Sequence, residues 1–363
     1  MSEPPRVLIA AGGTAGHVVP ALAIAGALRD RGAAVEFAGG ERAEAELVPA
    51  AGYPFHLLAV AGLDRRSPLK AARAAGLAAG AVRRARRLIA DGRFDAVLGG
   101  GGYVAGPVGL AALTRRVPLV LTEADSHLGM ANRLLAPFAR KVFLAFPLEG
   151  RDAARYEVSG RPIPPGGGAG DRAAARRRFD IPEDARCLLV FGGSQGARSL
   201  NEAALEAFGR DAPFHVLHAC GRRDYDDLRA RLDELGAPPH YRLEAYIEPF
   251  SDAYAAADLA AARAGGSVFE LAAAGLPAIL VPYPHATADH QSGNARWMAE
   301  GGAAVVVPDA ELDAARLAHE AETLLADRER LARMSVAARS LSRPDAAERI
   351  ADGVLNVARS HGR

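Results

Sequence analysis

The stretch "RVLIAAGGTAGHVVPALAIAGAL", residues 6–28, contains an apolar run, a glycine turn and a helical pattern. The run Arg6–Ala11 predicts a buried strand, and the apolar spacing over Pro20–Arg31 predicts a helix. Glycines between a strand and a helix let the backbone approach a ligand, and a helix N-terminus attracts anions. The turn matches neither G-x-G-x-x-G nor the P-loop. Because it ends in His17, it predicts chemistry beyond phosphate binding.

Composition narrows the class of protein. A chain of 363 residues exceeds the convenient size of one hydrophobic core, so we expect two domains. A net charge of +1 argues against a nucleic-acid binder. No run of 18 apolar residues predicts a membrane span, and the N-terminus does not look like a signal peptide. The two cysteines, Cys187 and Cys220, are expected to be buried free thiols.

Short apolar runs alternate with helical patterns along the whole chain, which predicts an α/β fold with parallel sheets. The further strands that we expect are Ala34–Ala38, Ala96–Leu98, Leu119–Thr122, Lys141–Ala145, His215–His218, Tyr241–Glu244, Leu259–Ala261, Ala278–Val281 and Ala303–Val307. Further helices are expected over Leu69–Ala90 and about Leu312–Arg359.

The pattern of strand, glycine turn and helix seen at residues 6–28 occurs a second time in the chain. "CLLVFGGSQGARSLNEAALEAF", from residue 187, repeats strand, glycine turn and helix, and "GRPIPPGGGAGD", residues 160–171, is too rich in Pro and Gly for an element. We predict domains at 1–160 and 172–340, a linker at 161–171, and a C-terminal helix within 341–363 that packs back on the first domain. Since α/β sheets bind ligands at the carboxyl ends of their strands, we expect both glycine turns to face one cleft.

The most informative segment is "ARAGGSVFELAAAGLPAILVPYPHATADHQSGNARWM", residues 262–298. Gly265-Gly266-Ser267 leads into a predicted helix, and Glu270 lies one turn into it. A carboxylate there suits a ribose diol; the alternative is an acid that stabilises the helix dipole by less than about 1 kcal/mol. His290 and Gln291 follow in a polar loop, as binding residues or as solvated ones.

Several ordered motifs carry a resemblance: "GGTAGHVVPALAIA", "LVPAAGYPFHLLAVAGL", "GGGGYVAGP", "TEADSHLGMANRLLAPFARKV", "VFGGSQGARSLN", "YIEPFSDAYAAADL" and the 262–298 segment. Over about residues 6–345 the chain resembles the MurG family of peptidoglycan N-acetylglucosaminyltransferases. The resemblance implies the GT-B architecture of two Rossmann-like domains. It also implies transfer of GlcNAc from UDP-GlcNAc to the 4-hydroxyl of MurNAc in undecaprenyl-linked lipid I, giving lipid II with inversion.

By this resemblance the N-terminal domain holds the lipid-linked acceptor and the C-terminal domain the UDP-sugar. The residues that match family contacts are Thr14, Ala15 and Gly16 for the donor sugar, Ser194 for the diphosphate, Ile247 for uracil, Glu270 for ribose, and His290 and Gln291 for the GlcNAc hydroxyls. Asn132 and Ser267 complete the expected substrate-binding set.

Three departures from the family pattern stand out. Where the family commonly has HEQN, this chain has Thr122-Glu123-Ala124-Asp125, so Asp125 replaces an asparagine that touches the donor sugar. Where the family commonly has GNPVR, this chain has Gly160-Arg161-Pro162-Ile163-Pro164, so Pro164 stands at the position of an arginine that reaches the donor. Arg161 is the expected substitute for it. The stretch "RAGGSVFE" is one residue shorter than usual.

Inverting transfer needs a base for the acceptor hydroxyl. His17 suits this role because an imidazole titrates near neutral pH, and Asp125 is the alternative base, with Glu123 as an orienter of His17.

The only Asp-x-Asp string, Asp224-Tyr225-Asp226, is interpreted as a helix start, so we predict no metal and no cofactor. The Ser194 turn, its helix dipole and Arg161 or Arg198 are expected to meet the diphosphate charge.

A basic, partly apolar segment predicts contact with the inner leaflet of the membrane. Residues 65–93 have one acidic side chain, Asp91, and these basic ones: Arg65, Arg66, Lys70, Arg73, Arg83, Arg84, Arg86, Arg87 and Arg93. Such a segment is typical of a membrane-surface helix, or of a solvated face; "LLAPFARK", residues 134–141, is a second candidate. We therefore expect a peripheral protein on the cytoplasmic face of the cell membrane.

Three other functions compete with this interpretation. A related GT-B enzyme would use another lipid or glycoside acceptor. A non-catalytic sugar-nucleotide-binding subunit is disfavoured because the donor-site residues are intact. An NAD-dependent oxidoreductase is disfavoured because its G-x-G-x-x-G motif is missing.

Overall fold

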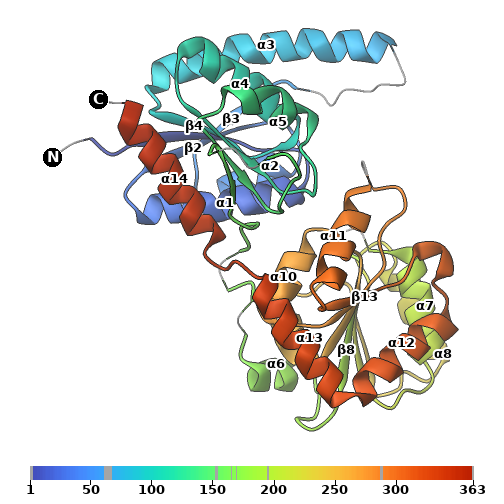
Figure 1. Cartoon of the computed structure of the whole chain (residues 1–363). Helices are drawn as coiled ribbons and strands as arrows, with labels where there is room; N and C mark the ends of the chain where they lie inside the picture. Colours follow the sequence, from blue (N-terminus) through green and yellow to red (C-terminus); the bar gives the residue numbers. More distant parts are fainter. Residues whose placement is uncertain are drawn as a thin grey trace. The chain divides into compact units, whose positions relative to one another are not determined.

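The computed structural model describes residues 3–60, 68–151, 154–164, 166–168, 170–193, 196–286 and 289–361, with backbone alone at Ala15, 68–75 and His361. The chain divides into two compact units (Figure 1). Unit 1 comprises Met1–Pro165 and Arg343–Arg363, and unit 2 comprises Gly166–Ser342. Each unit contains one all-parallel sheet flanked by helices, so the predicted α/β class is confirmed.

Unit 1 contains a seven-stranded sheet in the order β3-β2-β1-β4-β5-β6-β7. Its strands are β1 (Arg6–Ala10), β2 (Ala34–Gly39), β3 (Phe55–Leu57), β4 (Ala96–Gly99), β5 (Leu119–Glu123), β6 (Lys141–Leu144) and β7 (Tyr156–Val158). Its helices are α1 (Ala15–Asp30), α2 (Ala43–Ala50), α3 (Pro68–Gly92), α4 (Gly102–Arg115), α5 (Met130–Leu135), the 3-10 turn η1 (Ala136–Phe138) and α14 (Ala346–His361). The strand order reverses between β1 and β4, which is where α/β sheets bind ligands.

Helices cover both faces of this sheet because its strands are apolar on both sides. Helices α1, α2 and α14 pack on one face, and α3, α4 and α5 on the other (Figure 1). The last helix, α14, lies beside α1, and Arg31 donates to Asp352 at 2.6 Å. The C-terminal segment is therefore part of unit 1.

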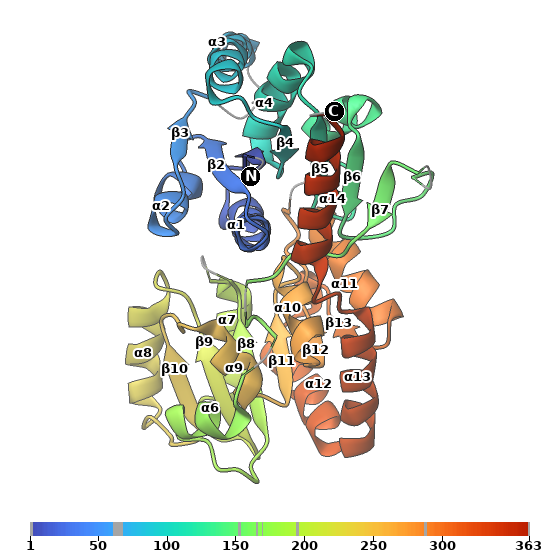
Figure 2. The same cartoon turned by 90° about the vertical axis from the view of Figure 1, so that its left-hand side faces the viewer.

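Unit 2 repeats the plan with a six-stranded sheet in the order β10-β9-β8-β11-β12-β13 (Figure 2). Its strands are β8 (Cys187–Phe191), β9 (His215–Ala219), β10 (Tyr241–Glu244), β11 (Leu259–Ala262), β12 (Ala278–Leu280) and β13 (Ala304–Val306). Its helices are α6 (Arg172–Arg178), α7 (Arg198–Phe208), α8 (Tyr225–Glu234), α9 (Phe250–Ala256), α10 (Ser267–Ala274), α11 (His290–Glu300), α12 (Ala314–Ala326) and α13 (Arg328–Leu341), with the 3-10 turn η3 (Asp309–Glu311). Here the order reverses between β8 and β11.

The sequence misplaced several elements. The first helix begins at Ala15, so Pro20 lies inside it instead of beginning it. The edge strands β3 and β7 were missed because three residues are too few to show a period. The final helical stretch is three helices, α12, α13 and α14, and the last of these belongs to unit 1.

Two further sequence expectations can be compared with the described part of the chain. Cys187 and Cys220 are free and buried, as predicted, and burial raises the pKa of the Cys187 thiol to about 12. Within the described ranges, no helix is both long and apolar enough to cross a bilayer.

Candidate functional site

The first glycine turn leaves β1 beside the loop that follows β4. A Cβ added at Gly102 would lie 1.9 Å from the carbonyl oxygen of Gly12, so the two backbones touch. Gly13 has a φ of +106°, which favours glycine. Thr14 is exposed and precedes α1, and Ala15 is its first residue. The glycines therefore bring two strand-end loops together at the switch point of the sheet.

His17 is the third residue of α1 and is half-buried. Its imidazole lies against the bare backbone of Gly101, where an added Cβ would be 2.8 Å from His17 Nδ1. Gly101 has a φ of +94° and precedes α4. The imidazole can therefore occupy this position only because residue 101 is glycine, since a side chain there would displace the ring.

A buried carboxylate organises the loop after β5. Glu123 accepts hydrogen bonds from Asn132 Nδ2 at 2.9 Å, from the N–H of Gly129 at 2.8 Å and from the N–H of Asp125 at 3.2 Å. Burial raises the pKa of the Glu123 carboxyl, although the hydrogen bonds from Asn132 and Gly129 oppose the shift. In these contacts Glu123 holds the loop that carries Asp125. Its predicted role as the orienter of His17 stays a prediction.

Arg161 joins this loop to the first glycine turn. Its guanidinium donates to the carbonyl oxygen of Gly16 at 2.5 Å and to that of Ala124 at 3.2 Å. The structure thus brings His17, Asp125 and Arg161, predicted from three distant motifs, to one edge of the unit 1 sheet. Asn132, buried on α5, also donates to the carbonyl of Thr122 at 2.9 Å.

Unit 2 places the predicted ribose carboxylate at its own switch point. Ser267 begins α10, and Glu270 lies in the first turn of that helix, directly after β11. The buried hydroxyl of Tyr254 donates to Glu270 Oε2 at 2.8 Å. Burial, followed by the charge of Glu270, raises the pKa of Tyr254 well above its ordinary value, so this hydroxyl remains a donor.

The predicted sugar-binding pair begins the next helix. The expectation that His290 and Gln291 lie in a polar loop is wrong, because they are the first two residues of α11. Gln291 Oε1 accepts the N–H of Tyr283 at 2.9 Å, and its Nε2 lies 4.0 Å from the Cβ position of Gly265. Asn294, buried on the same helix, donates to the carbonyl of Ala264 at 2.9 Å. These contacts tie α11 to the glycine turn before Glu270.

The other predicted site residues are distributed over unit 2. Ile247 is buried after β10, and Ser194 lies outside the described residues. Arg198 begins α7 and pairs with Glu202 at 2.8 Å. The Asp224-Tyr225-Asp226 string begins α8, as interpreted from the sequence.

Three residues that support the candidate site were not predicted from the sequence. Glu44 reads as one of several acids in an ordinary helix, yet it is fully buried beneath the first glycine turn. Tyr254 supports Glu270 from α9. Buried Arg263 donates to Ser199 Oγ at 2.8 Å and pairs with Asp309 at 2.6 Å. The sequence did carry a signal for such residues, namely a charged or aromatic side chain at the end of a strand or on an apolar helix face.

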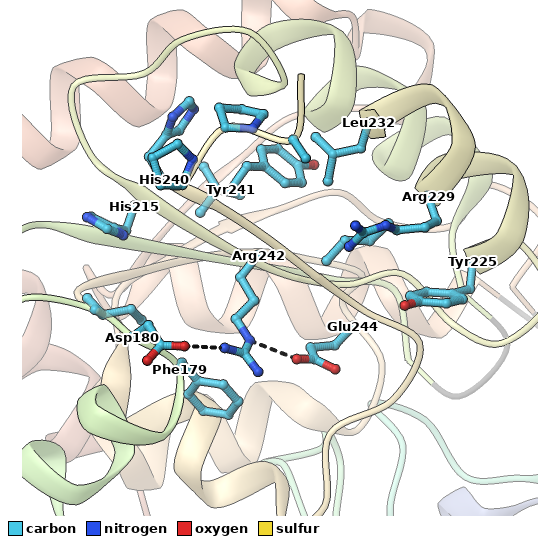
Figure 3. A pocket seen from close by; sticks show the side chains of 16 residues that line it. Phe179, Asp180, His215, Tyr225, Arg229, Leu232, His240, Tyr241, Arg242 and Glu244 are labelled. Carbon is cyan, nitrogen blue, oxygen red and sulfur yellow. Dashed lines mark hydrogen bonds and ion pairs between the residues drawn. The ribbon is translucent and has the colours of Figure 1, made fainter. Parts of the chain in front are cut away.

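A cavity of about 390 Å³ lies elsewhere, along the edge strand β10 (Figure 3). Arg242 crosses its wall between Asp180, at 2.7 Å, and Glu244, at 2.8 Å. None of the described site residues predicted from the sequence lines it. The cavity is therefore separate from the described residues of the candidate site.

Comparison with known proteins gives consistent matches. Residues 7–144 match the glycosyltransferase family 28 N-terminal domain and residues 187–350 its C-terminal domain. A protein of Salinibacter ruber is 43% identical, covering 98% of this chain and 97% of its own. One from Methylococcus capsulatus is 42% identical, covering 97% and 99%. Both are named UDP-N-acetylglucosamine--N-acetylmuramyl-(pentapeptide) pyrophosphoryl-undecaprenol N-acetylglucosamine transferase.

Solved structures give the same result. The crystal structure of Acinetobacter baumannii MurG matches with a TM-score of 0.79 and 30% identity, covering 97% of this chain and 100% of that one. A kitacinnamycin glycosyltransferase, at 18% identity and a TM-score of 0.72 over 98% of this chain and 100% of its own, shares the fold. The two parallel-sheet units are thus the Rossmann-like domains of a GT-B glycosyltransferase. The chain belongs to the MurG family of N-acetylglucosaminyltransferases, within glycosyltransferase family 28.

Proposed function

We propose that this protein transfers GlcNAc from UDP-GlcNAc to the 4-hydroxyl of MurNAc in undecaprenyl-linked lipid I, with inversion, giving lipid II. Relatives named for this reaction over nearly the full length support the proposal. The structural observation that carries it is the bridge from Arg161 to Gly16 and Ala124, because it joins the turn of His17 to the loop of Asp125.

Unit 2 holds the UDP-sugar in this proposal. Glu270, fixed by Tyr254, accepts from the ribose hydroxyls through its carboxylate. The backbone at Ile247 contacts uracil. Ser267, at the start of α10, and Ser194, by its family match, contact the diphosphate. His290 and Gln291 bind the GlcNAc hydroxyls, on a helix that Asn294 ties to the glycine turn.

Unit 1 holds the lipid-linked acceptor and supplies the base. The acceptor oxygen attacks C1 of GlcNAc while the bond from C1 to the diphosphate oxygen breaks, and UDP leaves with that electron pair. His17 takes the hydroxyl proton, since an imidazole is largely neutral and basic at physiological pH. Thr14, Ala15 and Gly16 contact the donor sugar, with Asp125 and Asn132 on the adjoining loop. Asp125 is the alternative base.

Product analysis tests the reaction. Wild-type protein is incubated with radiolabelled UDP-GlcNAc and a lipid I analogue, and the labelled disaccharide lipid is expected. Transfer to a different glycoside, or UDP-GlcNAc binding without transfer, would overturn the proposal.

Single-turnover rates assign the base. His17→Ala is expected to slow transfer by about 100-fold or more, the usual contribution of a general base. Asp125→Asn keeps a polar group of the same size and is expected to have a smaller effect. Near-normal transfer by His17→Ala with loss in Asp125→Asn would identify Asp125 as the base.

We further propose that unit 1 meets the inner leaflet through one surface. Exposed apolar side chains on α4, α5 and η1 are Leu110, Met130, Leu134 and Phe138. Exposed arginines lie around them or on α3, which packs against α4: Arg83, Arg84, Arg87, Arg116, Arg133 and Arg140. Arg65 and Arg66, and the side chains of Lys70 and Arg73, lie outside the described residues. An apolar patch with a cationic rim matches an anionic bilayer surface.

Vesicle flotation tests this surface at low salt. The protein is expected to float with phosphatidylglycerol-containing vesicles and less with neutral ones. Leu134→Ser should weaken flotation, whereas Val336→Ser, at an equally exposed apolar position of unit 2, should not. Equal flotation of both variants and the parent would refute the assignment.

A further inference from the structure

Glu44 is a fully buried acid in the first turn of α2. Its Oε2 accepts the N–H of Gly13 at 2.8 Å, and its Oε1 accepts the N–H of Gly40 at 2.9 Å. The hydroxyl of Tyr103, on α4, donates to Oε1 at 3.4 Å. One carboxylate therefore joins the segments that follow β1 and β2 to the start of α4.

The Glu44 carboxylate packs so closely against the glycine backbone that no side chain would fit between them. A Cβ at Gly12 would lie 2.5 Å from Glu44 Oε1, and one at Gly40 would lie 3.0 Å from it. The glycine turn thus rests directly on the carboxylate. Burying a carboxylate is unfavourable unless donors surround it, so these hydrogen bonds are strongly coupled to the shape of the turn.

The supported turn is the one that leads into His17, four residues after Gly13. A shift of the Gly13 amide moves the N-terminus of α1, and His17 is the third residue of that helix. The Gly101 backbone lies against the imidazole, where an added Cβ would be 2.8 Å from His17 Nδ1. Glu44 therefore confines the turn, and Gly101 confines the ring.

We propose that Glu44 is a positioning residue for the transfer reaction: through the amide of Gly13 it sets the first glycine turn, and with it His17. The inference rests on the proposed function, because His17 is the base in that proposal. Glu44 acts through the backbone of a turn that also carries Thr14, Ala15 and Gly16. Its effect is therefore expected to be larger on the rate of the chemical step than on donor affinity.

Glu44→Gln is the sharpest variant because it keeps the size of the side chain. Both oxygens of Glu44 accept a backbone N–H, so whichever one becomes an NH₂ group faces another donor. The turn must then shift. Glu46→Gln is the matched control, since Glu46 is an exposed acid in the same first turn of α2.

The kinetic test uses single-turnover transfer of GlcNAc to a lipid I analogue with saturating enzyme in excess. The rate constant under these conditions does not depend on the fraction of unfolded protein. Glu44→Gln is expected to lower this rate constant by about 10- to 100-fold, the scale of a small misplacement of a reacting group, with a much smaller rise in the Kd for UDP-GlcNAc. An unchanged rate constant, with only the fraction of folded protein reduced, would show a purely structural role and overturn the proposal.

Hydrogen–deuterium exchange gives a readout independent of catalysis. Glu44→Gln should speed amide exchange in a peptide covering Gly12–His17, and Glu46→Gln should not. If the wild type forms no product, the proposed function fails while this exchange difference still tests the support of the turn. If Glu44→Gln does not fold, Glu44→Asp, which keeps the charge but shortens the reach, must show both effects for the proposal to stand.

Discussion

The Arg161 guanidinium donates to the carbonyl oxygen of Gly16 at 2.5 Å. In a regular helix the N–H four residues later would engage that carbonyl, but residue 20 of α1 is proline and has no N–H. Arg161 therefore satisfies an acceptor that the helix leaves open. Its second bond, to Ala124, couples this helix start to the loop of Asp125.

Arg161→Gln should separate the two loops. We expect single-turnover transfer to fall about 10-fold, the scale of losing charge-assisted hydrogen bonds to two carbonyls. Arg359→Gln, at an exposed position of α14, is the control and should transfer at the parental rate. Parental transfer by Arg161→Gln would mean that the bridge does not position the site.

Gly101→Ala should displace His17. The new Cβ would collide with the imidazole of His17, and the backbone φ of +94° at position 101 strains any residue other than glycine. We expect a loss of about 1–3 kcal/mol in unfolding free energy and a transfer rate about 100-fold lower. Gly80→Ala, in open space on α3, should instead stabilise by roughly 0.5–1 kcal/mol with unchanged transfer. Chemical denaturation and single-turnover assays measure both effects, and a normal rate in Gly101→Ala would contradict the placement of His17.

Tyr254→Phe should weaken donor binding. Without its hydroxyl the Glu270 carboxylate loses a buried donor and the orientation that the bond imposes. We expect the Kd for UDP-GlcNAc to rise about 10-fold by calorimetry, as for a hydrogen bond to a charged group. Tyr225→Phe, beside the β10 cavity, should leave the Kd unchanged. Equal affinities in the three proteins would show that Glu270 does not depend on Tyr254.

His218 should make the stability of unit 2 depend on pH. Burial lowers the pKa of His218 from 6.5 to about 3, and the ring contacts Tyr241 and Asn201 at 2.8 and 3.0 Å. Between these pH values the unfolded chain binds a proton that the folded one does not. The free energy of unfolding must therefore fall as pH drops from 6.5 toward 3.

Glutamine at this position tests that dependence. His218→Gln keeps one acceptor and one donor but does not titrate. We expect it to be about 1–3 kcal/mol less stable at neutral pH, with a flatter pH profile below 6.5. Urea titrations across the range measure the slopes. Parallel profiles for the variant and the parent would exclude His218 as their source.

The sequence indicated most of this fold because its signal is periodic. Strands such as Arg6–Ala10 and Cys187–Phe191 are continuous apolar runs, since parallel strands are buried on both faces. The short edge strands β3 and β7 carry no such signal. The start of α1 was misjudged because proline usually begins a helix, whereas here Pro20 lies inside it.

The sequence also indicated the chemistry, because glycine turns, Glu270 and the polar residues after β12 stand in motifs that are local in the chain. What joins those motifs is not local. Glu44 lies 31 residues from Gly13, and Arg161 lies 145 residues from Gly16. Glu44 looks like a solvated helix acid until folding buries it against the Gly13 amide. Arg161 was predicted as a donor contact, and only the fold shows that it bridges two backbone carbonyls.

The sequence by itself therefore determined the α/β class and the family, and it predicted the residue types of the candidate site. The tertiary structure decided which carboxylate and which guanidinium bond to the backbone of the first glycine turn. The physical reason is that periodicity and turn chemistry act between near neighbours in the chain. A buried polar side chain, in contrast, takes its role from the donors and acceptors that the fold brings to it.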